Sequence, residues 1–104
     1  MALKVFWTDF SKKELDEIFA YYKKRAGSRI AGKLVVGIVK ETRNLSHQPH
    51  MGQKEELLSD RPEGFRYLIY KNYKIVYWIN TEKNRIEVVD VFDTRKNPHK
   101  IQSL

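Results

Sequence analysis

The first half of the chain carries hydrophobic residues at helical spacing. Four of them recur at i, i+3, i+4 and i+7 and share one helix face: Leu15, Ile18, Phe19 and Tyr22. Ser11 and Glu14 have the spacing of a capping box, and Phe10 with Leu15 that of a hydrophobic staple. We therefore expect Ser11 to cap this first helix and Gly27 to end it.

A second helix is predicted directly after Gly27, with Ser28 as its cap. Its apolar stripe consists of Ala31, Leu34, Val35, Ile38 and Leu45. Gly32 and Gly37 interrupt it, and each costs roughly 0.5–1 kcal/mol relative to Ala. We expect the two glycines to compensate by allowing close helix–helix approach. The short separation between the two patterns predicts an antiparallel helical hairpin.

From Phe65 onwards the period of the apolar residues changes to two. Residues 65–70, 73–80 and 85–92 are rich in aromatic and β-branched side chains, which predicts three strands. Lys71 and Asn72 form a two-residue hairpin turn, in which Asn tolerates a positive φ. This turn places Tyr70 opposite Tyr73, and by the same register Arg66 faces Tyr77.

Both faces of this predicted sheet are apolar. One face carries Arg66, Leu68, Ile75, Tyr77 and Ile79; the other carries Phe65, Tyr67, Ile69, Lys74, Val76 and Trp78. One face has to pack on the helical hairpin. The second is too hydrophobic to meet water alone, so we expect the C-terminal segment or a partner to cover it.

Two further segments complete the fold. Leu3 to Trp7 is typical of a short first strand, whereas residues 46–64 form a loop region in which Gln53 to Leu58 is either a helical turn or a short strand. Pro98 prevents the last strand from continuing. The sequence predicts one α+β domain over residues 1–104, in the order β-α-α-β-β-β: an N-terminal strand and an antiparallel helical hairpin packed on a mostly antiparallel four-stranded sheet.

Charge and composition narrow the function classes. The 20 Lys and Arg and 13 Asp and Glu give a net charge of +7, which indicates nucleic acid, the ribosome or an acidic protein as partner, or solubility alone. No run of five like charges occurs, so any basic patch has to be assembled by folding. The chain has no Cys, which excludes disulfides, thiol catalysis and sulfur-ligated zinc.

Other chemistry is not expected. His47 and His50 lie three residues apart without a third ligand at useful spacing, so we expect no metal site, and no cofactor motif is present. The apolar runs are too short to span a membrane, and no cleavable apolar segment leads the chain. The expected compartment is the cytoplasm.

Several segments together resemble a known family. Trp7-Thr8-Asp9-Phe10 precedes the first helix, and Phe65-Arg66-Tyr67-Leu68 and Asn72-Tyr73-Lys74-Ile75-Val76-Tyr77 follow the hairpin. The last segment is Val91-Phe92-Asp93-Thr94-Arg95-Lys96-Asn97-Pro98. Their order and spacing resemble the RelE/ParE superfamily of toxins from bacterial type II toxin–antitoxin modules, often labelled plasmid-stabilisation proteins. The resemblance covers nearly the whole chain.

The resemblance implies a toxin that arrests growth until a cognate antitoxin binds it. RelE-like members cleave messenger RNA in the ribosomal A site, whereas ParE-like members inhibit DNA gyrase. A basic surface is compatible with both branches, so the net charge does not distinguish them. We expect the antitoxin to be an extended, partly helical segment that buries the second sheet face.

The resemblance also indicates candidate catalytic residues for RNA cleavage, which needs a base, an acid and cations around the phosphate. Lys74 stands where RelE-like members usually have an Arg, and Arg95 lies where the family has a basic residue beyond the last strand. His99 is the nearest C-terminal acid or base. Lys54, Glu55 and Glu56 lie in a region where some nuclease members hold a Lys or Glu. These residues also have simpler interpretations. Lys74 could be an exposed strand lysine, and Arg95 could be anchored to a carboxylate such as Asp90. His99 could be a solvated tail residue, and Glu55 and Glu56 could be solvated surface residues.

Other details are similar to the ParE-like branch. These are Arg66-x-Leu68, Tyr73-Lys74-Ile75-x-Tyr77 and the Arg-Lys-Asn-Pro tail, so target-binding candidates are Arg66, Lys74, Arg95 and Lys96. Arg66 has the alternative of pairing with a helix carboxylate. We therefore favour a gyrase inhibitor that acts by protein binding. The alternatives are a ribosome-dependent endoribonuclease and a non-toxic basic domain that only binds an antitoxin or nucleic acid.

Overall fold

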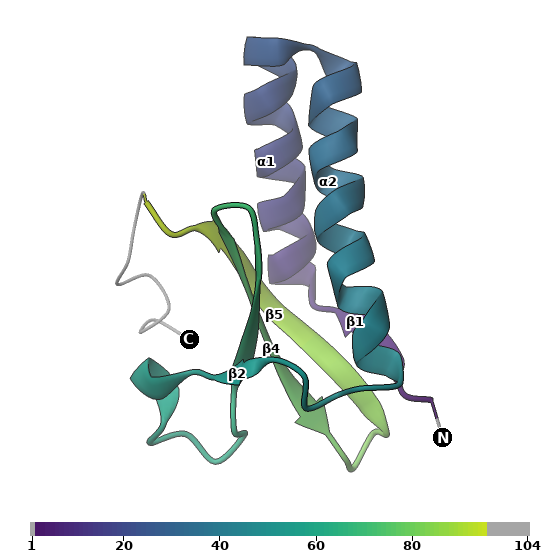
Figure 1. Cartoon of the computed structure of the whole chain (residues 1–104), viewed down its shortest axis with the longest axis vertical. Helices are drawn as coiled ribbons and strands as arrows, with labels where there is room; N and C mark the ends of the chain where they lie inside the picture. Colours follow the sequence, from purple (N-terminus) through teal and green to yellow (C-terminus); the bar gives the residue numbers. More distant parts are fainter. Residues whose placement is uncertain (1, 96–104) are drawn as a thin grey trace.

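A computed structural model describes residues 2–95 of the chain. Helices α1 (Asp9–Ala26) and α2 (Ser28–Arg43) form a hairpin that lies against one sheet (Figure 1). The strands are β1 (Lys4–Trp7), β2 (Gln53–Lys54), β3 (Arg66–Tyr70), β4 (Tyr73–Asn80) and β5 (Arg85–Asp93), and the short 3-10 helices are η1 (Asn44–Ser46) and η2 (Glu56–Leu58). The α+β class and the order of the long elements are confirmed.

Helix α1 begins one turn earlier than the capping box predicts. Its cap is Thr8, whose hydroxyl oxygen accepts the Ser11 N–H at 3.2 Å. Ser11 is fully buried, and its hydroxyl donates to the Val88 carbonyl at 2.9 Å, which ties the helix to β5. The predicted staple is wrong as well, because Phe10 is the second residue of α1 and does not precede its cap. Ser11 is therefore a packing contact between helix and sheet.

In helix α2, Ala31, Leu34 and Ile38 of the predicted stripe are buried and Val35 is half-buried, but the predicted cap is wrong. Gly27, at φ 91°, ends α1 and caps α2 without a side-chain hydrogen bond, so Ser28 is simply the first helical residue. Leu45 is buried but lies in η1, beyond the end of the helix.

The two glycines of α2 do not bring the helices together. A Cβ on Gly32 would meet no atom, whereas a Cβ on Gly37 would overlap the Tyr70 hydroxyl of β3. Gly37 therefore serves the contact between helix and sheet, and the expected helix–helix role is wrong.

The sheet has five strands in the order β1-β5-β4-β3-β2, one more than predicted. Strand β1 pairs parallel with β5, and the other pairings are antiparallel. The additional strand β2 has only two residues, too few for a period-two signal. Residues 53–58 thus hold both a short strand and, in η2, a helical turn.

The register of the β3–β4 hairpin is the predicted one. Tyr70 pairs with Tyr73 and Arg66 with Tyr77, so the two-residue turn is confirmed. The positive φ falls on Lys71, at 54°, and not on Asn72 as expected.

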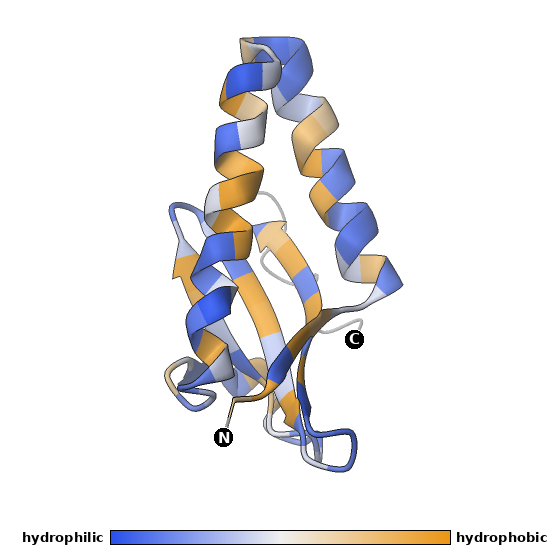
Figure 2. Ribbon diagram, turned by 90° about the vertical axis from the view of Figure 1, so that its right-hand side faces the viewer, coloured by the Kyte–Doolittle hydropathy of each residue, from blue (hydrophilic) through white to orange (hydrophobic). Residues whose placement is uncertain are grey.

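Two hydrophobic clusters fill the two faces of the sheet. The helix-side cluster includes Leu34, Ile38, Leu68, Ile75, Tyr77, Ile86 and Val88, with Leu15, Ile18 and Tyr22 packed against it. Figure 2 shows that the strands behind the hairpin are largely hydrophobic.

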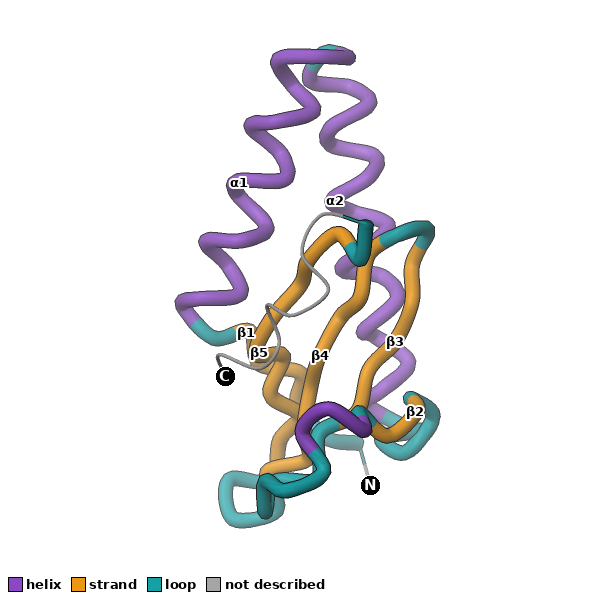
Figure 3. Tube along the Cα trace, turned by 90° about the vertical axis from the view of Figure 1, so that its left-hand side faces the viewer, coloured by secondary structure: helices purple, strands orange, loops and turns teal. Residues whose placement is uncertain are grey.

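The opposite face holds a smaller cluster of Leu58, Phe65, Val76 and Phe92, flanked by Tyr67 and Trp78. Figure 3 shows η2 lying across this face, away from α1 and α2. The chain thus partly covers its own second face with the segment around η2. The C-terminal residues that we expect to cover this face lie beyond Arg95, outside the described residues.

Candidate functional site

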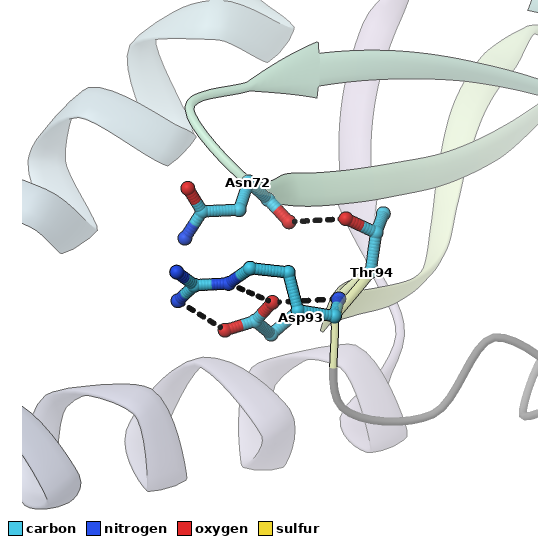
Figure 4. A network of polar contacts seen from close by, with 4 residues as sticks. Asn72, Asp93 and Thr94 are labelled. Atoms are coloured by element: carbon cyan, nitrogen blue, oxygen red, sulfur yellow. Dashed lines mark hydrogen bonds and ion pairs between the residues drawn. The ribbon is translucent and has the colours of Figure 1, made fainter.

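Arg95 is fixed at the end of β5 by a neighbouring carboxylate. Its Nε and Nη2 donate to the two carboxylate oxygens of Asp93 at 3.2 and 3.0 Å, and its backbone N–H donates to the same group at 2.9 Å. Thr94 donates to the Asn72 carbonyl through its N–H and its hydroxyl, at 3.0 and 3.1 Å (Figure 4). Arg95 is thus anchored to a carboxylate, and that carboxylate is Asp93 instead of Asp90.

This ion pair sets the electrostatics at the end of the sheet. Asp93 is 6% exposed, whereas the Arg95 side chain is 65% exposed. The hydrogen bonds and charge of Asp93 raise the pKa of Arg95 above its ordinary value. The guanidinium therefore stays charged and presents one side to solvent while its other side is held.

The buried Tyr73 and the half-buried Tyr22 lie beside Asp93 on the helix side. Tyr73 is 3% exposed, and burial, together with a hydrogen bond with Tyr22 of α1, raises the pKa of Tyr73 well above its ordinary value. Its phenol therefore stays protonated at neutral pH. A protonated buried phenol is a poor general base, because a base has to be able to take up a proton.

Lys74 is engaged on the opposite face of the sheet. Its ammonium group forms an ion pair with Glu55, whose side chain is 3% exposed, and lies 4.1 Å from the centroid of the Tyr67 ring. The other carboxylate oxygen of Glu55 accepts the Leu57 N–H at 3.2 Å and caps η2. The expectation that Glu55 is solvated is therefore wrong; it is a buried partner of Lys74. Lys54 and Glu56 are exposed.

The sheet register separates the two candidate cations. Tyr73 pairs with Asp93 and Lys74 pairs with Phe92, and neighbouring residues of a strand point to opposite faces. Lys74 thus lies on the η2 side, whereas Arg95 is bound to Asp93 beside the buried Tyr73 on the helix side. The fold does not bring them into one phosphate-binding cluster. The remaining candidates, Lys96 and His99, lie outside the described residues.

Arg66 holds a loop. Its Nη1 donates to the carbonyls of Gly52 at 2.8 Å and His50 at 3.3 Å, so the expected partner, a helix carboxylate, is not found. The Tyr77 hydroxyl joins this loop by donating to the Pro49 carbonyl at 2.8 Å and accepting the Gly52 N–H at 3.0 Å. Burial raises the pKa of Tyr77. Both side chains fix residues 49–52 against the sheet.

A groove of about 680 Å³ between the helical hairpin and the β3–β4 turn is a feature that sequence reasoning missed. Apolar and phenolic side chains line it together with three lysines: Tyr22, Ile30, Leu34, Val36, Tyr70, Tyr73, Lys33, Lys40 and Lys71. Ile30 and Val36 are 54% and 50% exposed. These two apolar residues fall outside the buried stripe of α2, which is the signal that points to a second contact surface.

Two other kinds of site are absent from residues 2–95. No group of three or more His, Asp or Glu side chains there lies close enough to hold a metal ion. Neither described helix is long and apolar enough to cross a membrane.

The two-layer fold of a helical hairpin on a twisted sheet is that of several solved toxins. The chain superposes on a structure titled "Chromosomal ParDE TA system from P. aeruginosa" with a TM-score of 0.73 and 20% identity, covering 88% of this chain and 96% of that one. An E. coli RelE mutant in the free state gives a TM-score of 0.61 at 15% identity, with coverages of 98% and 94%. The RelBE2 complex from Mycobacterium tuberculosis gives 0.57 at 19% identity, with coverages of 89% and 99%.

Residues 5–98 match the model of the family described as "ParE toxin of type II toxin-antitoxin system, parDE". The chain therefore belongs to the ParE toxin family of type II toxin–antitoxin systems. No curated protein matches it.

Proposed function

We propose that this toxin arrests growth by binding and inhibiting DNA gyrase and does not cleave messenger RNA. The observation that carries the proposal is the separation of Lys74 from Arg95, each paired with its own carboxylate on a different side of the sheet. RNA cleavage needs several uncompensated cations around one phosphate, with an acid and a base beside them.

The engaged state of Lys74 is the strongest part of this argument. A lysine that binds a phosphate in the transition state has to leave its present partner, which is a carboxylate buried to 3% exposure. Leaving that carboxylate unpaired in the protein interior costs several kcal/mol. Lys74 is better suited to holding η2 on the sheet than to catalysis.

Arg95 is suited to contacting a protein target. Its guanidinium is oriented by Asp93 yet 65% exposed, and arginines of this kind are enriched among the residues that dominate protein interfaces. Lys96 follows it in the sequence, so we assign target binding to Arg95 and Lys96. Arg66, bound to the carbonyls of Gly52 and His50, has a supporting role.

The antitoxin partner fits the groove beside α2. An amphipathic helix lays its apolar side into such a groove, and acidic residues at its edges would meet Lys33, Lys40 and Lys71. A similar fold has been solved with an antitoxin partner, in the intact E. coli RelBE toxin–antitoxin complex. We infer that the cognate antitoxin occupies this groove, in addition to or instead of the η2 side of the sheet.

Supercoiling of relaxed plasmid by purified gyrase tests the target. We expect the toxin at micromolar concentration to block supercoiling, the antitoxin to restore it, and Arg95→Ala to lose the inhibition while still binding the antitoxin. Toe-printing of messages on translating ribosomes is the counter-assay. Intact supercoiling together with cleaved message would transfer the protein to the RelE-like branch.

A further inference from the structure

The net positive charge of the chain is concentrated in one segment. Residues 18–40 contain six Lys and Arg and no Asp or Glu, so they hold +6 of the net charge of +7. The other 81 residues are nearly balanced, with 14 cations and 13 acids. The net positive charge of the protein is therefore concentrated in residues 18–40, within the helical hairpin, and is not spread evenly over the chain.

Four of the six cations occupy the free end of the hairpin. Lys23, Lys24 and Arg25 lie in the last turn of α1, and Arg29 lies in the first turn of α2. The hairpin extends beyond the end of the sheet (Figure 1), and its tip is mainly hydrophilic (Figure 2). We call residues 23–29 the hairpin tip.

All six cations are exposed, and none forms an ion pair with any residue from 2 to 95. Arg25 is held in place without being neutralised, because its guanidinium carbon lies 3.8 Å from the centroid of the Tyr21 ring. A stacked guanidinium keeps its N–H groups available for a phosphate.

Helix stability explains only part of this pattern. Cations in the last turn of α1 are favourable because they face the negative end of the helix dipole. Arg29 is at the opposite, positive end of α2, where a cation is unfavourable. Further along the same helix, Lys33 and Lys40 lie within about 60° of Arg29 around the axis and extend the charge over roughly 16 Å.

We propose that the hairpin tip binds the phosphate backbone of duplex DNA. Between residues 23 and 29 no apolar side chain is larger than that of alanine. A protein interface needs a desolvated apolar or aromatic centre, whereas a phosphate backbone is bound by unpaired Lys and Arg alone. The tip has the composition of a surface that binds a phosphate backbone. The groove beside it, with Ile30 and Val36, has the composition of a protein interface.

The test measures binding of the full chain to a fluorescent 20-base-pair DNA duplex by anisotropy, between 50 and 200 mM NaCl. The tip variant is Lys23→Gln, Lys24→Gln, Arg25→Gln and Arg29→Gln. The matched control, Lys12→Gln, Lys13→Gln, Lys54→Gln and Lys83→Gln, removes the same charge from exposed sites elsewhere. The control separates a local site from an effect of net charge.

We expect the wild type to bind with micromolar affinity at 50 mM NaCl and the tip variant to bind at least about tenfold more weakly. The slope of log K against log salt concentration should be smaller in magnitude by about 3 for the tip variant, because each phosphate contact contributes roughly 0.9 to this slope. The control variant keeps the wild-type slope. Equal losses in both variants, an unchanged slope in the tip variant, or stronger competition by poly-glutamate than by unlabelled duplex would overturn the proposal.

A second variant keeps the test valid if the fourfold change disturbs folding. Arg29→Glu places an acid in the first turn of α2, which the helix dipole favours, so the protein should fold while DNA binding weakens. If the folded Arg29→Glu variant bound DNA with wild-type affinity, the hairpin tip would not be the DNA-binding site. Because the assay contains no gyrase, its result is independent of the proposed inhibition.

Discussion

The Lys74–Glu55 ion pair gives the sharpest stability prediction. Replacing Lys74 by Met retains most of the apolar stem but removes the charge that balances Glu55. Since the carboxylate side chain is 3% exposed, it is left unpaired in a nearly dry site. Removing one partner of a buried ion pair costs about 3–5 kcal/mol. Because Lys74 itself is 17% exposed, we place the expected loss at the lower end, about 3 kcal/mol.

The double variant Lys74→Met with Glu55→Gln should recover most of this loss. Its buried amide carries no charge, and it still accepts the Leu57 N–H that caps η2. Urea unfolding followed by circular dichroism measures the four corners of the cycle at pH 7. We expect a coupling free energy of roughly 2–3 kcal/mol, and a melting temperature for Lys74→Met lower by more than about 10 °C.

Two outcomes would refute the reasoning. A coupling free energy below about 0.5 kcal/mol would mean that the pair is solvated and Lys74 is available to a ligand. A folded, stable Lys74→Met protein that loses toxicity would return Lys74 to the list of functional cations. The control is Lys83→Met, since Lys83 is exposed and its ammonium group pairs with no carboxylate in residues 2–95.

Three further predictions concern the fold. Burial raises the pKa of Asp90 from 3.8 to about 6, so the folded protein binds the carboxyl proton of Asp90 more tightly than the unfolded chain does. The stability that Asp90 contributes at low pH is therefore lost as the pH rises from about 4 to 6. Asp90→Asn should therefore stabilise the protein by up to about 3 kcal/mol at pH 7.5 and by much less at pH 4, measured by urea unfolding at both pH values; equal effects at the two would exclude this cause. Gly32→Ala should stabilise α2 by about 0.5–1 kcal/mol in thermal melts, whereas Gly37→Ala should destabilise the protein by about 1–2 kcal/mol, because its methyl group would overlap Tyr70. Stabilisation by both would mean that the ring moves aside freely. Thr8→Ala should cost about 1 kcal/mol in the same melts, and a loss below about 0.3 kcal/mol would mean that Thr8 is not the cap.

The long elements could be predicted because each rests on a local pattern. Helical spacing in residues 9–43 and period-two alternation in residues 66–93 give the hairpin and the three long strands. The turn at Lys71 and Asn72 then determines the register, since a two-residue loop leaves one pairing for Tyr70 and Tyr73. These features depend on residues close in sequence.

The errors concern contacts between distant residues. Ser11 has the sequence context of a cap but is used by Val88, 77 residues away, and Gly37 makes room for Tyr70. Strand β2 is defined by its neighbour β3, because two residues carry no periodicity of their own. Sequence patterns near Ser11 cannot show whether its hydroxyl caps the helix or forms a hydrogen bond with a distant residue, because the same group can do either.

The candidate site was predicted residue by residue but not as an arrangement. The sequence indicates that Lys74 and Arg95 lie near one end of the sheet, yet their partners decide what they can do. Glu55 was missed as a partner because a Glu-Glu pair in a loop region is typical of a solvated surface. Asp93 was missed in favour of Asp90, although it is only two residues from Arg95.

The topology of a reporter plasmid in growth-arrested cells tests the central claim most directly. After induction of the toxin, plasmid DNA is resolved into topoisomers on chloroquine gels. Inhibition of gyrase predicts a shift towards relaxed topoisomers that co-expression of the antitoxin prevents. Arrested growth with the plasmid still at its normal negative supercoiling would contradict the account.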